Sequence, residues 1–398
     1  MCGKESPPFP VEVGVKQGDV LAPVLFNLFT SVVMKLSQAS LIEEDGVYLE
    51  YRLDGNLFNI RRLQAHTKTT TLRLLDLQYA DDAALVTHSA VSMQRILDTL
   101  SSIYQAFGLQ INTRKTEILM QLTDQNQDVP EFHIQGARLQ VVPFFKYLGS
   151  IVSSSSKIDN DVIDKINKAS RAFGLLRSKV FSNKHLKLPT KIQVYEAMCI
   201  STLLYGAETW TIYRRHLAQL EHFHISCLQK ILGLTWKDRI THTQIFDRTN
   251  TTSIEAIIAK RQLCWLGHVI RMPDERLPRQ ILYGQLQDSL RRSGGPKKRY
   301  KDQAKTTLKK CTIPPSDLEA LANNRSAWKA RIKEGVAILE ESRKAQRARK
   351  RQRRHANRGA PAAPNPQWTC PTCGRMCSSR IGLVSHTNAH RRRELHPR

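Results

Sequence analysis

The 398-residue chain has no apolar stretch long enough to cross a membrane. Its longest apolar run, Val20–Met34, has 15 residues and is interrupted by Asn27, Thr30 and Ser31, whereas a span needs about 18 or more. The first residues also lack the apolar core of a signal peptide. These absences predict a soluble, intracellular protein, nuclear or cytoplasmic, with no membrane partner.

Cysteines are few and mostly scattered. Of the eight, only Cys370, Cys373 and Cys377 lie close together in the sequence. Single cysteines far apart do not indicate a disulfide framework, and a short cluster in a reducing compartment is more typical of one metal site.

Acidic residues are scarce in the larger, second part of the chain. Residues 1–150 hold 13 Lys and Arg against 16 Asp and Glu, whereas residues 151–398 hold 48 against 19, a net charge of +29. Such an excess favours a polyanionic partner, most simply nucleic acid. An anionic membrane surface is the alternative, but no basic amphipathic helix rich in Trp and Phe is present. A purely structural scaffold does not fit this charge.

Two adjacent aspartates stand in the middle of a strand-like segment, Leu74–Thr87. Apolar residues alternate before and after them, which predicts two strands joined by a tight turn. Asp81 and Asp82 would lie at the tip, where two carboxylates repel each other unless a cation lies between them. Oxygen ligands suit magnesium. An ordinary solvated turn is the alternative interpretation.

Four motifs, in one order, resemble the reverse transcriptases of non-LTR (LINE-type) retrotransposons. Tyr79–Asp82 resembles the catalytic hairpin of that family, and Gly14–Phe29 resembles its template-contacting loop and following helix. Gly108–Asn112 with Lys115–Glu117 resembles the next palm motif, and Phe145–Gly149 resembles the primer-side motif. The resemblance implies an RNA-directed DNA polymerase that handles RNA and DNA.

The resemblance also assigns roles to individual residues. Asp81 and Asp82 would be catalytic ligands of magnesium, and Lys115 would assist nucleotide binding or protonate the pyrophosphate. An ordinary solvated lysine beside Arg114 is the alternative for Lys115. Template and primer contacts would come from Gln17, Gly18, Tyr147, Leu148 and Gly149.

The resemblance implies one further aspartate, which this sequence does not supply. In the family it lies on a separate strand before the loop of Gly18, but the only carboxylates before Gly18 here are Glu5 and Glu12. We therefore expect a truncated reverse transcriptase that binds nucleic acid without polymerising alone. The alternative is a nucleic-acid-binding zinc-finger protein whose palm is a relic.

Apolar periodicity predicts helices on both sides of a polar linker, Ser153–Ser156. Residues 96–107 repeat at three- and four-residue spacing, and residues 162–180 form a heptad-like seam on a basic helix at the place of a polymerase thumb. Asp54-Gly55 lies between alternating runs and predicts a hairpin. Residues 294–299 are a turn followed by a basic cluster, and a flexible surface loop is the simplest interpretation.

Two further motifs, Leu204–Trp210 and Trp265–Met272, resemble the C-terminal region of the same retroelements, but their residues indicate no particular chemical role. His224 and Cys227 fall on one apolar helix stripe with Leu220, so we interpret them as core residues rather than metal ligands.

Residues 343–354 carry eight positive charges in twelve residues. A block of like charges is expected to be disordered until it meets a polyanion, so the run would be a nucleic-acid arm, a nuclear-localisation signal or both. The charges are those of Arg343, Lys344, Arg347, Arg349, Lys350, Arg351, Arg353 and Arg354.

The last motif has the spacing C-x2-C-x12-H-x3-H and consists of Cys370, Cys373, His386 and His390. This spacing predicts structural zinc in a ββα finger. Cys377 occupies the position usually held by Phe, which thins the small core. The helix positions that normally read bases are Ser379, Gly382 and Ser385, which cannot form bidentate pairs with bases. Binding largely independent of sequence is therefore expected.

Together these patterns predict an α+β protein with four parts. These are a partial reverse transcriptase palm of antiparallel hairpins and packed helices (1–152), a helical, basic, thumb-like and C-terminal region (153–340), a disordered, basic, proline-rich linker (341–366) and a ββα zinc finger (367–392).

Overall fold

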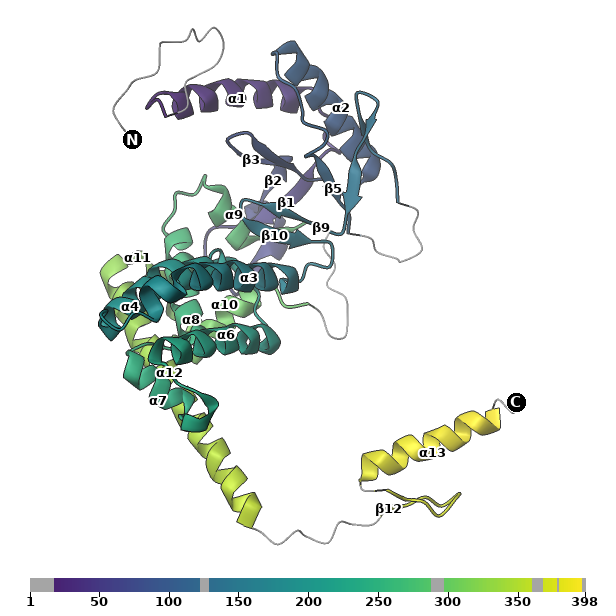
Figure 1. Cartoon of the computed structure of the whole chain (residues 1–398). Coiled ribbons are helices and arrows are strands. Elements are labelled where there is room, and N and C mark those ends of the chain that lie inside the picture. The colour runs from purple at the N-terminus through teal and green to yellow at the C-terminus, as the bar shows by residue number, and fades with distance from the viewer. Residues whose placement is uncertain (1–17, 122–128, 288–296, 360–367, 378, 396–398) are drawn as a thin grey trace. The chain divides into compact units, whose positions relative to one another are not determined.

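The structure, a computed structural model, describes residues 18–121, 129–287, 297–359, 368–377 and 379–395 (Figure 1). The chain divides into two compact units, Met1–Leu339 and Glu340–Arg398. Helices and short strands both occur, which confirms the predicted mixture of α and β structure. None of the helices in the described ranges is both long and apolar enough to cross a membrane.

The first part of the chain contains two long helices and several short strands. They follow in the order α1 (Ala22–Ala39), β1 (Val47–Tyr51), β2 (Thr70–Leu74), β3 (Asp76–Tyr79), β4 (Asp82–Leu85), α2 (Ala90–Ala106), β5 (Glu117–Leu119), β6 (His133–Ile134), β7 (Ala137–Arg138), β8 (Gln140–Val142), β9 (Phe144–Tyr147) and β10 (Ser150–Ser153), with two short 3-10 turns between β1 and β2.

The strands form small sheets. β3–β4, β6–β7 and β9–β10 are antiparallel pairs, β5 and β8 are parallel, and β1 lies between β2 and β11 (Gly284–Leu286). Helix α2 begins at Ser89, whose hydroxyl accepts the N–H of Ser92 at 3.1 Å, and it buries Ile96 and Leu97. The predicted amphipathic helix is confirmed, and Gly108 follows its end with φ +73°.

The hairpin predicted at Asp54-Gly55 does not form. β1 pairs with β2 and β11 rather than with the segment after Gly55. That segment is held elsewhere, because the guanidinium of the buried Arg62 donates to the carbonyls of Arg52, Asp54 and Tyr283, and Leu57 is inserted into the helical core. The local turn signal is therefore overridden by long-range contacts.

The second part of the chain is mostly helical. Its main elements are α3 (Asp159–Leu176), the π-helix Arg177–Phe181, α4 (Leu188–Val194), the π-helix Tyr195–Ile200, α5 (Ser201–Leu203), a 3-10 turn (Ala207–Thr209), α6 (Arg214–Leu232), α7 (His242–Thr249), α8 (Ile254–Ile270), α9 (Leu277–Tyr283), β11, α10 (Tyr300–Lys310), α11 (Leu318–Asn323) and α12 (Arg325–Gly359). The predicted seam of α3 is confirmed, since Val162, Ala169 and Phe173 are buried.

Two apolar cores organise these helices. One core is formed by the helices from α3 to the first turns of α8, and the other by the helices from the rest of α8 to α12. The second core also takes in Leu57, whose N–H donates to Glu319 Oε1 at 2.6 Å. Residues on both sides of position 152 thus share one sheet and one core, and the domain division at 152 stays a prediction.

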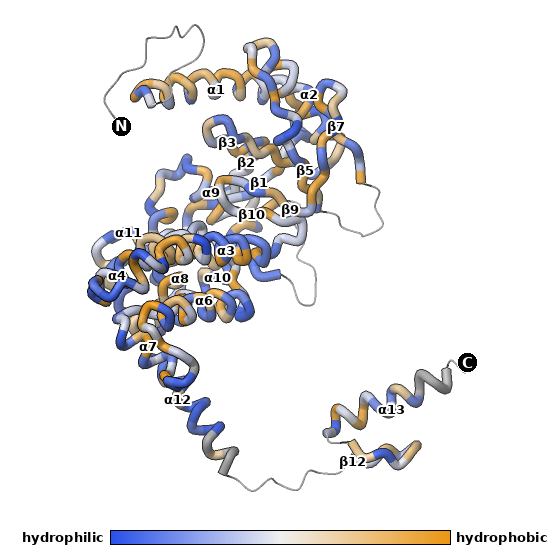
Figure 2. Tube along the Cα trace, viewed as in Figure 1, coloured by the Kyte–Doolittle hydropathy of each residue, from blue (hydrophilic) through white to orange (hydrophobic). Residues whose placement is uncertain are grey.

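The basic run 343–354 is helical, so the prediction of disorder is wrong there. It forms the later part of the 35-residue helix α12, which is hydrophilic along this stretch (Figure 2). Arg, Lys, Gln and Ala are all strong helix formers, and the helix is nucleated by its first turns, where Trp328 and Ile332 are buried. The proline-rich spacer after it lies outside the described residues.

Candidate nucleic-acid and metal sites

The two aspartates lie at the tip of an antiparallel hairpin, as predicted. β3 and β4 pair with Tyr79 opposite Asp82, and Ala80 turns the chain with φ +52°. Asp81 and Asp82 are both exposed. The hairpin itself is less buried than the apolar pattern indicated, because Leu77 is 36% and Tyr79 67% exposed. The carboxylates therefore face solvent.

A third acidic residue lies on the hairpin but far from its tip. Asp76 is opposite Leu85 at the other end of the strand pair, about 10 Å from Tyr79 at the usual rise of a strand. Burial raises the pKa of Asp76, and Gln38 Nε2 donates to its Oδ1 at 3.1 Å. Among the described residues, no group of three or more potential metal ligands includes Asp81 or Asp82.

The structure brings the primer-side motif to the carboxylate hairpin. The hydroxyl of Tyr147, at the end of β9, donates to the carbonyl of Leu77 at 2.9 Å. Burial, followed by the nearby carboxylates of Asp82 and Asp76, raises the pKa of Tyr147, so the hydroxyl stays protonated as the donor. Two motifs about 65 residues apart in sequence are thus joined by one hydrogen bond.

The turn between β9 and β10 is made by Leu148 and Gly149. Both have positive φ, +45° and +82° respectively, which glycine adopts at little cost and leucine does not. Leu148 is 41% exposed. The three residues predicted to contact the primer therefore form one corner, at which Leu148 is exposed and Tyr147 is hydrogen-bonded to the carboxylate hairpin.

The other predicted palm residues are not brought to this corner by any contact of the structure. Lys115 is exposed, and its backbone N–H donates to Asn112 Oδ1 at 3.2 Å in a turn. Gly18 is exposed with φ +94°, and Gln17 lies outside the described residues. Their assigned roles rest on the resemblance alone.

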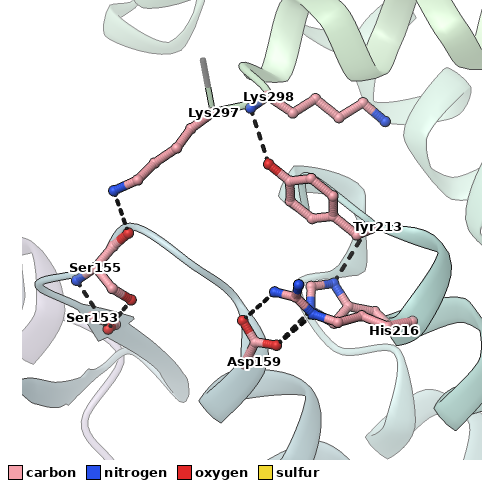
Figure 3. Close-up of polar contacts among 8 residues, drawn as sticks. Ser153, Ser155, Asp159, Tyr213, His216, Lys297 and Lys298 are labelled. Atoms are coloured by element: carbon pink, nitrogen blue, oxygen red, sulfur yellow. Dashed lines mark hydrogen bonds and ion pairs between the residues drawn. The ribbon is translucent and has the colours of Figure 1, made fainter. Parts of the chain in front are cut away.

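The basic segment 297–299 is fixed to the start of the helical region (Figure 3). Lys297 Nζ donates to the carbonyl of Ser155 at 2.6 Å, and the N–H of Lys298 donates to the hydroxyl of Tyr213 at 3.1 Å. Beside them, the Asp159 carboxylate accepts from Arg215 at 2.8 and 2.9 Å. Lys297 and Lys298 therefore hold residues 297–299 against the helical region, and this part of the segment is not a free loop.

The four predicted zinc ligands converge in the second unit. β12 (Trp368–Thr369) and β13 (Met376–Cys377) form a hairpin, and α13 (Arg380–Leu395) follows. All four ligand atoms lie within 4.8 Å of one another. Cys373 Sγ lies 3.0 Å from His386 Nε2 and 3.2 Å from His390 Nε2. Two thiols and two imidazoles are the donor set of a structural zinc site, and their convergence on one point fits this metal.

Burial disfavours ionisation of the Cys370 thiol, but the N–H groups of Thr372 and Cys373 point toward its sulfur and lower its pKa overall. The core around the ligands is small. Trp368 lies opposite Cys377 in the hairpin, and both are only half-buried, as is Leu383. A unit with so small a core would need a bound metal for stability.

We expect the finger to bind nucleic acid without a sharp sequence motif. Of the three base-reading positions, Ser379 is already used as a helix cap, because its hydroxyl accepts the N–H of Gly382 at 3.0 Å. Gly382 has no side chain, and Ser385 cannot reach a base with two bonds. Selection from a random duplex library by the segment 366–398 should therefore return no motif. Enrichment of three or more specified base pairs would contradict this.

The charged run of α12 presents most of its cations to solvent. Lys344, Arg349, Lys350, Arg351, Arg353 and Arg354 are exposed, whereas Arg343 and Arg347 are half-buried. Arg343 lies 3.7 Å from Glu340 in an i,i+3 ion pair. A helix with a broad exposed cationic face can contact phosphates without reading the base sequence.

His224 and Cys227 are core residues, as predicted. His224 is 1% exposed, its Nδ1 lies 2.8 Å from the hydroxyl of the buried Tyr195, and its Nε2 lies 3.2 Å from the carbonyl of Thr252. Burial lowers the pKa of His224 to about 4. The ring is therefore neutral near pH 7, donating to Thr252 and accepting from Tyr195, and it belongs to no metal-ligand group in the described residues.

A cavity adjoins the carboxylate hairpin, and no sequence pattern predicted it. An apolar cavity of about 630 Å³ is bounded by Leu77 of β3 and by residues of α8, α9 and α10 that include Trp265 and Leu282. The hydroxyl of Tyr300 is buried without a hydrogen-bond partner in the described structure. Most of the motif Trp265–Met272 lies on α8, and only the fold brings it to the hairpin.

Comparison with known proteins identifies a family match in the first part of the chain. Residues 2–152 match the family described as reverse transcriptase (RNA-dependent DNA polymerase). The putative uncharacterized transposon-derived protein F52C9.6 of Caenorhabditis elegans is 25% identical over 214 residues, which cover 51% of this chain and 74% of that protein.

Two further relatives are described as RNA-directed DNA polymerase from mobile element jockey. That of Drosophila funebris is 23% identical over 233 residues, and that of Drosophila melanogaster is 22% identical over 235 residues. Each alignment covers 57% of this chain and 22% of the polymerase. The chain thus spans about a fifth of the length of these two relatives.

Residues 2–152 are therefore a reverse transcriptase domain. The resemblance to the reverse transcriptases of non-LTR retrotransposons is confirmed, and the chain is a relative of that group.

Proposed function

We propose that this 398-residue polypeptide binds RNA and DNA, largely without sequence preference, and does not synthesise DNA by itself. One observation supports the nucleic-acid role most strongly: the primer-side corner of a reverse transcriptase domain is hydrogen-bonded to its carboxylate hairpin through Tyr147 and Leu77. The net charge of +29 after residue 150 supports the same partner.

Asp81 and Asp82 are the residues that would hold magnesium. Two-metal phosphoryl transfer needs carboxylates from more than one strand to clamp the ions about the attacking and leaving oxygens. The described part of the chain supplies only this adjacent pair, since Asp76 lies at the far end of the hairpin. We therefore propose that magnesium would be held too weakly for chemistry by this polypeptide alone.

Cys370, Cys373, His386 and His390 would hold zinc as a structural ion, with all four positions closed by protein ligands. The ion would fix the hairpin β12–β13 on α13. The basic run 343–354 would contact phosphates, and the same residues could act as a nuclear-localisation signal.

A second candidate is a nucleic-acid-binding zinc-finger protein whose reverse transcriptase domain is a relic. The exposure of Asp81 and Asp82, with no third ligand from the described residues, favours this reading. The two candidates differ in the palm: a working primer-side corner should distinguish a recessed 3′ end from a blunt duplex, and a relic should not.

The proposal predicts that the affinity for nucleic acid falls steeply with salt concentration. The charged run of α12, residues 343–354, should account for part of this dependence. Replacing its eight Lys and Arg residues by Gln keeps residues of similar helix propensity. The slope of log affinity against log salt should then fall by about 0.9 for each lost contact on duplex DNA, and by about 0.7 on single strands. Fluorescence anisotropy across a salt series, with helix content checked by circular dichroism, measures it.

An unchanged slope would show that the run contacts no phosphate, and would leave nuclear localisation as its role. Undetectable binding of the unaltered polypeptide to any RNA or DNA would contradict the proposed function as a whole.

A further inference from the structure

A buried carboxylate ties the motif Leu204–Trp210 to the primer-side hairpin. Asp161, on α3, is 3% exposed. Its Oδ1 accepts the backbone N–H of Ile151 in β10 at 3.0 Å, and its Oδ2 accepts the indole N–H of Trp210 at 2.8 Å. One side chain thus connects three segments that are separate in sequence: β10, α3 and the retroelement motif.

A buried lysine one turn further along α3 holds the turn of the hairpin. The Lys165 side chain is 3% exposed, and its Nζ lies 4.0 Å from Asp161 Oδ1. The same ammonium donates to the carbonyl of Gly149 at 2.6 Å and lies 4.6 Å from the centroid of the Tyr205 ring. A buried charge with three such partners fixes the position of the turn.

Tyr205 completes the corner from the other side. Its hydroxyl donates to the carbonyl of Leu148 at 3.4 Å, and its ring carbon Cε1 lies 3.2 Å from the position that a Cβ would take at Gly149. The ring packs directly against the turn and is nevertheless 55% exposed. An aromatic side chain that is held on one side and open on the other is suited to contact a ligand at low entropic cost.

We propose that Tyr205 is part of the primer-binding surface, where its exposed ring stacks against the last nucleotides of the primer strand beside Leu148 and Gly149. This inference rests on the proposed nucleic-acid function. Lys165 and Asp161 are positioning residues, which set the turn and the ring without touching nucleic acid. Stacking on an aromatic ring is tolerant of sequence, in keeping with a polypeptide that binds without a motif.

The location supports a primer end rather than continuous duplex. The neighbouring residue Tyr147 donates to Leu77 of the hairpin that carries Asp81 and Asp82, and Asp82 is close enough to raise the pKa of Tyr147. The corner therefore adjoins the carboxylates to which the proposed function assigns magnesium. The motif Leu204–Trp210, whose role the sequence alone did not reveal, thereby gains one: it supplies the ring and the indole that complete the corner.

The test compares two ligands of equal length, a primer–template with a recessed 3′ end and a blunt duplex. The unaltered polypeptide should bind the recessed end more tightly. Tyr205→Ala should weaken that binding about ten-fold, in the range found when one stacked base is lost, and should leave the blunt duplex within about two-fold. Tyr205→Phe should retain the preference, because it keeps the ring.

Tyr213→Ala is a matched control, since Tyr213 is also partly exposed, lies under an arginine and is hydrogen-bonded to the backbone, but at Lys298. Its preference for the recessed end should be unchanged. Lys165→Met should lose the preference, whereas Lys168→Met, on the same helix in a half-buried pair with Asp164, should keep it. Thermal denaturation verifies that each variant is folded.

Equal binding of both ligands by the unaltered polypeptide would overturn the inference, and so would an equal loss on both ligands in Tyr205→Ala. A preference that survives Tyr205→Ala would overturn it as well. Absence of binding to either ligand would instead refute the proposed function itself.

Discussion

Removal of zinc is expected to unfold the finger, residues 368–395, while leaving the unit Met1–Leu339 folded. The hairpin has two residues in each strand, and the apolar side chains of the finger are half-buried, such as Trp368 and Leu383, or exposed, such as Met376 and Ile381. Such a unit cannot offset its conformational entropy by burial alone. Zinc binding by comparable peptides supplies about 10–16 kcal/mol at pH 7, so the metal should decide whether the finger folds.

A chelator should therefore make the finger sensitive to protease and release one zinc per polypeptide, as measured by mass spectrometry of intact and digested protein. Cys373→Ser should have the same effect without chelator. Cys377→Ser is the matched control, because Cys377 lies in the hairpin outside the ligand group, and it should retain zinc. A finger that stays protease-resistant after chelation would refute the metal assignment.

Asp161→Ala is expected to cost about 3–5 kcal/mol of unfolding free energy, the range for breaking a buried ion pair. The substitution leaves the ammonium of Lys165 buried without its carboxylate, and it removes the acceptor of Ile151 and Trp210. Unsatisfied buried donors and unpaired buried charges are among the few causes of losses this large.

Asp164→Ala is the control, since Asp164 forms an i,i+4 pair with Lys168 on the same helix, and both side chains are only half-buried. Ion pairs that remain in contact with solvent contribute about 0–1 kcal/mol. Urea denaturation of both variants gives the comparison. A loss below about 1 kcal/mol for Asp161→Ala would mean that the buried network does not hold β10 to the helical region.

Local sequence patterns predicted the elements that depend on near neighbours. The carboxylate hairpin, α2, the seam of α3 and the hairpin and helix of the finger follow from alternation, helical spacing and ligand spacing over fewer than 25 residues each. The core role of His224 also followed, because its position on an apolar stripe is a local property.

Long-range contacts could not be predicted in the same way. No pattern in Gly284–Leu286 predicts that it pairs with β1. The hairpin predicted at Asp54-Gly55 does not form because the buried Arg62 holds this segment, with a hydrogen-bond partner 221 residues away. The contacts of Asp161 with Trp210 and of Tyr147 with Leu77 are of the same kind. The family resemblance predicted the order of these motifs along the chain, whereas the contacts between them became apparent only in the folded structure.

The basic run shows two local rules in competition. Repulsion among like charges led us to predict disorder for residues 343–354. Helix propensity and the packed helix before them favour a helix instead. The helix forms because each added residue extends an existing nucleus. Repulsion between the exposed charges is screened by water and salt. Continuity with a folded helix was the missing consideration.

Primer extension tests the central claim most directly. Purified polypeptide, magnesium, all four deoxynucleotides and a primer–template should give binding without extended product, both unaltered and with Asp81→Ala. Binding confirms the nucleic-acid role, and absence of product follows from a hairpin whose carboxylates lack a third ligand among the described residues. Magnesium-dependent extension by the unaltered polypeptide that disappears in Asp81→Ala would contradict the account.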